Sequence, residues 1–265
     1  MKIFISGITG KVGQLLTPLI LEDKQLELVG GSCSSSSSKI GEDIGKVNGQ
    51  KKIGVNVSED IPKTISIDLI IDFSSSAGSM IALETALEKG IPILIGTTGF
   101  EPNQIEEIEH SSNKIAILSA PNTSSGIAIL KSLLNESKKF FSKENKFQIS
   151  ETHHTEKRDA PSGTALDIQK ELLNIFPDAN LKIESFREGN NPGEHTVSVA
   201  MENEVIELKH MAKDRSIFAL GALKGAMWLS EKPAGLYHMQ DIYSCLLYTS
   251  PSPRDQRGYG FTSYG

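Results

Sequence analysis

Apolar residues in the first 120 positions fall into short runs separated by stretches with helical spacing. The runs are rich in Ile, Leu and Val and lack polar alternation, which is typical of strands covered on both faces. They span residues 3–5, 26–30, 69–73, 91–95 and 115–118. Helical patterns lie between them, over residues 11–21, 79–89 and 103–110. Strands and helices that alternate in this way predict an α/β fold with a doubly wound parallel sheet over residues 1–122.

The pattern changes after Asn122. Helices are expected over residues 125–141, 164–175 and 219–229, and a strand over residues 147–151. Three further strand-like stretches have little helix between them, and they cover residues 181–186, 195–201 and 204–210. Glu202 and Asn203 suit a tight hairpin between the last two. We therefore expect a second, α+β domain with a mixed sheet over residues 123–233.

The end of the chain follows neither pattern. Residues 244–265 have no apolar period and are rich in Gly, Pro and Ser. We interpret this tail as disordered, or as an extension that is not native to the gene.

Composition and charge exclude several classes of protein. The net charge of −6 argues against a protein held to nucleic acid by phosphate contacts. The longest apolar runs are too short for a membrane span. Because Met1 leads directly into a strand pattern without an export signal, we expect a cytoplasmic protein. The two cysteines, Cys33 and Cys245, have no metal-type spacing, so no metal site is predicted.

A glycine-rich turn follows the first predicted strand and opens a helix. Gly7, Gly10 and Gly13 give the spacing GxxGxxG in place of the commoner GxGxxG. Small residues allow the backbone to approach a pyrophosphate, and the N-terminus of the helix favours an anion. Its position at the start of an alternating pattern predicts a Rossmann-like dinucleotide-binding domain.

The sequence leaves the choice of coenzyme open. An acid about twenty positions after the turn would bind the adenosine ribose of NADH. Residues 31–34 contain none, whereas the serines and Lys39 suit the 2′-phosphate of NADPH. We hypothesise that NADPH is used at least as well as NADH. A solvated serine loop without coenzyme contact is an equal alternative.

Two other turns follow predicted strands of this domain. One begins with Gly96, Thr97 and Thr98, and the other runs from Ala120 to Thr123. In open α/β sheets the ligand crevice lies at the carboxyl ends of the strands. Small and hydroxyl-bearing residues at those ends suit a nicotinamide ring and its ribose.

The segment ETHHTEKRDAPSGTA, residues 151–165, gathers groups for proton-coupled chemistry on an anion. An imidazole titrates near neutral pH, so His153 is the candidate proton donor. Lys157 can offset the charge of a carboxylate and donate a proton. Thr164 followed by Asp167 resembles a capping box, which would place the N–H groups of Gly163 and Thr164 at a helix N-terminus.

With these motifs in order, the chain resembles the 4-hydroxy-tetrahydrodipicolinate reductase family, also called dihydrodipicolinate reductase. The resemblance rests on the GxxGxxG turn, the GTTGF turn, the histidine segment and the ending GLYHMQDI. It covers about residues 1–243. It implies a usual homotetramer built through the second domain, and a return of the final helix and of residues 234–243 to the first.

Carried over by position, the resemblance implies three groups of site residues. The pyrophosphate would contact Gly7, Ile8, Thr9, Gly10, Lys11 and Val12, and the nicotinamide side would contact Gly96, Thr97, Thr98, Ala120, Pro121, Asn122 and Thr123. Cys33 and Ser34 fall where many relatives place an acid or an arginine for the adenosine ribose. His153 would donate or accept a proton and Lys157 would be a second donor. His154, Gly163 and Thr164 would bind the substrate.

The implied reaction is the reduction of a small cyclic imine dicarboxylate by NADPH or NADH, in lysine and diaminopimelate biosynthesis. One alternative is another two-domain NAD(P)-dependent oxidoreductase, acting on a sugar or an aspartate-like acid. A second is a non-catalytic NAD(P)H-binding sensor. The sensor would leave the paired histidines and Lys157 unexplained.

Overall fold

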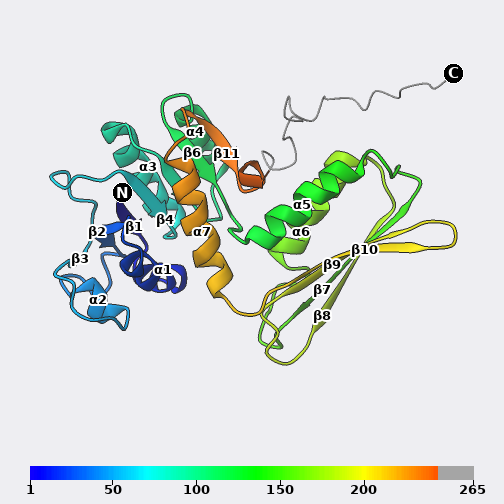
Figure 1. Ribbon diagram of the computed structural model, residues 1–265, viewed down its shortest axis with the longest axis horizontal. Coiled ribbons are helices and arrows are strands. Elements are labelled where there is room, and N and C mark those ends of the chain that lie inside the picture. Colours follow the sequence, from blue (N-terminus) through cyan, green and yellow to red (C-terminus); the bar gives the residue numbers. More distant parts are fainter. Residues whose placement is uncertain (244–265) are drawn as a thin grey trace, which may run out of the picture.

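The computed structural model describes residues 1–243, and its first unit is built on a seven-stranded parallel sheet (Figure 1). The strand order is β11-β6-β5-β4-β1-β2-β3. The strands are β1 (Lys2–Ser6), β2 (Glu27–Ser32), β3 (Val57–Ser58), β4 (Leu69–Asp72), β5 (Ile93–Ile95), β6 (Ala116–Ser119) and β11 (Gly235–His238). The order reverses at β1, so the glycine turn that follows β1 lies at the switch point where such sheets bind ligands.

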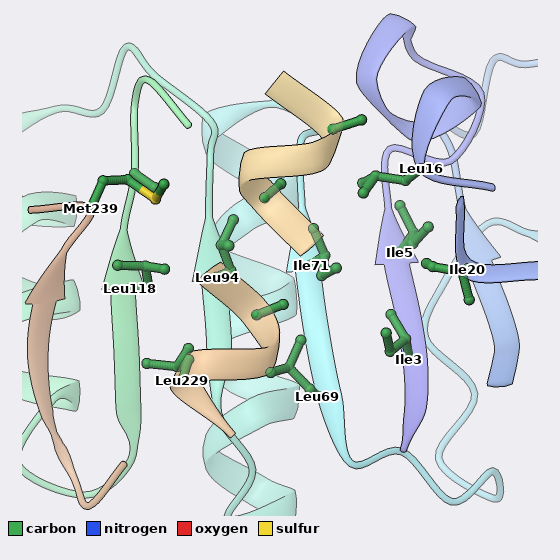
Figure 2. Close-up of a cluster of buried hydrophobic side chains, with 14 of the residues drawn as sticks. Ile3, Ile5, Leu16, Ile20, Leu69, Ile71, Leu94, Leu118, Leu229 and Met239 are labelled. Carbon is green, nitrogen blue, oxygen red and sulfur yellow. The ribbon is translucent and has the colours of Figure 1, made fainter. Parts of the chain in front are cut away.

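Helices cover both faces of this sheet, as the continuous apolar runs predict. They are α1 (Lys11–Glu22), α2 (Ile44–Val47), α3 (Ser76–Lys89), α4 (Pro102–Ser111) and α7 (Ser216–Leu229). On one face Ile3, Ile5 and Leu69 pack with α1 and α7 (Figure 2). On the other, Phe4 and Ile70 pack with α3 and α4. The parallel sheet is therefore buried on both sides.

The second unit is a four-stranded mixed sheet with two helices on one face (Figure 1). Its strand order is β10-β9-β7-β8, and only the β7–β8 pair is parallel. The elements are α5 (Ser125–Ser137), β7 (Lys146–His153), α6 (Gly163–Ile175), β8 (Leu181–Arg187), β9 (Glu194–Ala200) and β10 (Val205–Met211). The predicted hairpin is confirmed, because the Met201 N–H donates to the Glu204 carbonyl between β9 and β10.

Alternate residues of β7 face the helices. Phe147, Ile149, Glu151 and His153 are buried, and the residues between them are more exposed. The two apolar ones join a core with α5 and α6, whereas Glu151 and His153 bring ionisable groups into the same layer. The period-2 geometry of a strand therefore places the histidine segment beneath the start of α6.

The chain returns to the first sheet at α7, before residue 234, where we expected the second domain to end. α7 lies within the range assigned to the second domain, but its buried Ala222 and Ala226 belong to the core of the first. β11 then pairs with β6 at the sheet edge. The expected tail, residues 244–265, lies outside the described residues. Within residues 1–243 no helix is both long and apolar enough to cross a membrane.

Candidate active site

The glycine turn after β1 is shaped by contacts that only glycine permits. Gly7 has φ +84°, and a Cβ there would lie 2.2 Å from the carbonyl oxygen of Phe73. α1 begins after Gly10 without a side-chain cap, so its first N–H groups stay available to an anion. Ile8 is fully buried beneath the turn, whereas Lys11 is exposed. Gly7, Thr9 and Gly10 line the crevice beside the turn, whereas Ile8 and Lys11 do not.

A cavity of about 440 Å³ opens beside this turn. Gly7, Thr9 and Gly10 line one part of it, and Cys33 and Ser34 line another. The structure therefore brings together residues that we predicted for the pyrophosphate and for the adenosine ribose. Val12 is not among its lining residues and packs against the core of the first sheet.

Two carboxylates that the sequence reasoning missed also line this cavity. Glu59 and Asp60 follow β3, whose end lies beside the end of β2. Lys39, in contrast, pairs with Glu42 at 3.3 Å and does not line the cavity. The acids were missed because β3 has only two residues and gives almost no periodic signal.

The turn after β5 is held by a buried carboxylate. Asp72 at the end of β4 is fully buried and accepts a hydrogen bond from Thr97 Oγ1 at 2.7 Å. Thr97 Oγ1 in turn accepts from the Ser74 N–H at 2.9 Å. Gly96 packs against the ring of Phe73, and Thr98 is exposed. The Thr97 hydroxyl therefore shapes the turn, and Gly96, Thr97 and Thr98 are not among the residues that line the cavity beside the glycine turn.

The second predicted nicotinamide turn connects the two units of the fold. Ala120, Pro121 and Asn122 line a cavity of about 310 Å³ between the ends of β6 and β11 and helices α5 and α6. The Asn122 amide donates to Thr164 Oγ1 at 3.0 Å, which links this turn to the start of α6. Thr123 is buried and donates to the Phe218 carbonyl at 2.7 Å. Its hydroxyl thus joins the connection to α7.

The start of α6 differs from the predicted capping box. Ser162 is the cap, and its hydroxyl accepts from the Ala165 N–H at 3.2 Å. Thr164 accepts from Asn122 instead, and Asp167 pairs with Lys131 at 2.9 Å. Gly163 is exposed, and the space where a Cβ would stand is open. The first turn of α6 is therefore exposed at Gly163, and Ser162 is the residue that caps it.

His153 ends β7 and is almost enclosed. Its Nδ1 is hydrogen-bonded to the carboxylate of Glu151, and its ring meets the ring of His195 edge-on at 5.1 Å between centroids. Burial lowers the pKa of His153, and the neighbouring Glu151 carboxylate opposes that effect. Burial alone would raise the pKa of Glu151, but hydrogen bonds from Ser185, His153 and Arg187 bring it below its ordinary value.

His154 and Lys157 lie on the loop that follows. The His154 N–H donates to the Asn191 carbonyl at 2.8 Å, and the ring is partly exposed. Lys157 Nζ pairs with Asp159 at 2.9 Å, and this ion pair lowers the pKa of Asp159. The structure thus places His153 at the end of β7 and His154 and Lys157 on the loop between β7 and α6, so that two imidazoles and an ammonium lie before a helix N-terminus.

Two family models match the chain in succession. The model of the N-terminus of dihydrodipicolinate reductase matches residues 1–123, and the model of its C-terminus matches residues 126–243. Together they span both units of the fold, and the break between them falls beside the Asn122 connection.

Relatives and one solved structure agree with these matches. The 4-hydroxy-tetrahydrodipicolinate reductase of Colwellia psychrerythraea is 33% identical over 261 residues, which cover 91% of this chain and 97% of the relative. That of Buchnera aphidicola subsp. Cinara cedri is 36% identical, with 91% and 96% covered. The dipicolinate-bound dihydrodipicolinate reductase from Paenisporosarcina sp. TG-14 has the same fold, with a TM-score of 0.77 and 20% identity over 90% of this chain and 97% of that one.

Proposed function

The chain belongs to the dihydrodipicolinate reductase family, and from this premise we propose how its residues divide the reaction. It is an NAD(P)H-dependent oxidoreductase that reduces 4-hydroxy-tetrahydrodipicolinate in lysine and diaminopimelate biosynthesis. This activity takes the place of the two alternatives, another two-domain oxidoreductase and a non-catalytic sensor.

The first unit fits a dinucleotide. At Gly7 no side chain can be accommodated, and the uncapped start of α1 offers N–H groups to a pyrophosphate. The cavity beside them reaches Cys33 and Ser34, where the adenosine ribose would lie. The turns at Thr98 and Pro121 would then face the nicotinamide. When bound there, NADH or NADPH supplies the hydride.

The second unit binds the dicarboxylate and manages its protons. The open first turn of α6 at Gly163 and Thr164 accepts one carboxylate, and the helix dipole stabilises it by roughly 0.3–2 kcal/mol. His154 and Lys157 contribute further donors and positive charge. His153 gives the proton that balances hydride addition to the conjugated imine, and Lys157 is a second donor. The two units close about the connections near Asn122 and Ala234, which excludes water.

The observation that supports this division is the folding of one segment, from Glu151 to Thr164, into a buried histidine, a lysine loop and an open helix start. The test is a coupled assay with freshly generated substrate, in which oxidation of NADH and NADPH is followed by absorbance. We expect His153→Gln to lower kcat by about 100-fold or more and to leave the Kd for NADPH unchanged. An equal loss of coenzyme affinity would contradict the role given to His153.

We further propose that the chain acts in the cytoplasm as a homotetramer. The support for assembly is the open face of the four-stranded sheet, opposite α5 and α6. By strand register, Phe186, Val205 and Met211 point to that face, and they are 51%, 58% and 61% exposed. These apolar side chains lie among polar ones such as Glu207 and Lys209 on the same face, and exposed apolar residues in a polar surround fit a subunit interface. The molar mass in solution tests the assembly.

A further inference from the structure

Glu151 is a buried carboxylate at the centre of the histidine segment. Its side chain has no exposed surface. A charge in such a place is costly unless it is paired and hydrogen-bonded, so its partners indicate its role. Those partners are His153 Nδ1 on β7, the Ser162 N–H at 3.2 Å before α6, and Ser185 and Arg187 Nη1 on β8, the last at 3.0 Å.

The contact with Glu151 determines which nitrogen of His153 exchanges a proton. An ionised carboxylate can only accept, so Nδ1 carries hydrogen and donates it. The neutral ring then keeps its lone pair on Nε2. Nε2 faces the backbone at Gly193, where an added Cβ would stand only 3.0 Å away. Nε2 is therefore the atom at which His153 gains and loses its proton.

Arg187 extends this arrangement to the lysine loop. Besides contacting both oxygens of Glu151, its guanidinium donates to the carbonyl of Lys157 at 3.2 Å and to the carbonyl of Asp159. The planar fork of donors suits this simultaneous binding, which a lysine could not reproduce. One buried ion pair thus connects His153, the backbone of Lys157 and the start of α6.

We propose that Glu151 is a positioning residue that holds His153 as the Nδ1–H tautomer and, with Arg187, keeps the lysine loop and the start of α6 in place around it. The proposal rests on the proton-donor role of His153 given above. It assigns Glu151 no contact with substrate or coenzyme.

Four ionisable groups face His153: Glu151 on β7, Lys157 on the loop, Arg187 on β8 and His195 on β9. Burial lowers the pKa of His153, Lys157 and Arg187 lower it further, and Glu151 alone of the groups named here raises it. Glu151→Gln removes that opposing charge and leaves the others. We expect the pKa of His153 to fall by about one pH unit or more.

The experiment combines a spectroscopic and a kinetic measurement on the full chain. The ¹⁵N shifts of the histidine rings, assigned with His153→Gln, report the tautomer and the pKa of His153 without substrate. We expect the Nδ1–H tautomer in the wild type and a lower pKa with mixed tautomers in Glu151→Gln. The alkaline limb of kcat should move to lower pH by the same amount, while the KM for NADH changes less than about twofold.

Glu156→Gln is the matched control, because it removes the same charge from an exposed position in the same segment. It should leave the tautomer, the pKa and the pH profile as in the wild type. Glu151→Asp covers the case in which the Gln variant fails to fold. It keeps the charge but is one methylene shorter, so we expect mixed tautomers and a kcat between those of the wild type and His153→Gln.

An unchanged tautomer and pKa in a folded Glu151 variant would overturn the proposal, whatever its activity. Failure of the proton-donor role of His153 would give a different result. Full kcat in His153→Gln would remove the proton-donor role, whereas the ring shifts of the free chain would still report whether Glu151 fixes His153.

Discussion

His195 shows how enclosure changes the behaviour of a single residue. It lies on β9 between His153 and His210, is 4% exposed and contacts the hydroxyl of Ser162. Burial, with repulsion from the neighbouring imidazoles, lowers its pKa to about 4. The ring is therefore neutral in the folded chain at physiological pH, which suits its packing against His153.

This lowered pKa predicts a loss of stability in acid. Below pH 6.5 the unfolded chain binds a proton at His195 that the folded chain refuses until pH falls to about 4. The contribution of His195 to the free energy of unfolding is therefore complete above pH 6.5. It decreases by up to about 3 kcal/mol as the pH falls from 6.5 to about 4. Urea unfolding at pH 7 and pH 5, at one protein concentration, measures the fall. His195→Gln should reduce it, and an equal fall in the variant would assign it to other groups.

At the residue scale, the sequence predicted which candidate groups lie together better than it predicted their contacts. His153, Lys157 and Gly163 come together because they share one short segment. Glu151 was visible as a residue, but its role depends on the inward-facing register of β7 and on Arg187, which is 36 positions away. A signal was present in the alternation Phe147, Ile149, Glu151, which places the carboxylate on a buried face.

At the scale of elements, long apolar runs were predicted well and short pieces were not. β1, β4, β5 and β6 are buried strands with clear runs. β3 has only two residues and is defined by its pairing with β2, so the hydrophobic pattern does not predict it. The start of a helix is fixed by its capping residue. α3 begins at Ser76, after the cap Ser75, whereas the pattern predicted a start at residue 79. Caps depend on one hydroxyl, so they shift boundaries without changing the pattern.

The missed end of β3 bears on the coenzyme. Glu59 and Asp60 place negative charge in the cavity where a 2′-phosphate of NADPH would enter, and Lys39 is occupied by Glu42. We expect the double variant Glu59→Gln, Asp60→Asn to raise kcat/KM for NADPH relative to NADH by about threefold or more, the scale of an exposed charge interaction. Glu42→Gln lies outside the cavity lining and serves as the control. An unchanged ratio would remove these acids from coenzyme selection.

At the scale of the whole molecule, two sites on separate sheets must act as one. The cavity that we propose for the coenzyme lies at the ends of β1 and β2, and His153, the proposed proton donor, lies at the end of β7. The sheets are joined by the turn at Asn122, by its bond to Thr164 and by α7, which packs on the first sheet (Figure 1). Sequence patterns predicted both units, but only the family resemblance implied the return of the final helix, because the residues of α7 alone have the pattern of an ordinary apolar helix.

The open face of the second sheet gives the last prediction. If it carries the subunit interface, an added lysine there places a further ammonium in a surface that closes against another chain and opposes assembly. We expect the wild type to have the molar mass of four chains by light scattering, and Val205→Lys or Phe186→Lys to shift the mass toward smaller species. Leu166→Lys is the control, because that side chain is 46% exposed on α6, on the opposite side of the sheet. Loss of assembly in Leu166→Lys alone would place the interface on the helices. The first turn of α6, with Thr164, lies on the other side of the sheet from these substitutions. The kcat of a variant that dissociates therefore shows whether a single chain is as active as the assembly.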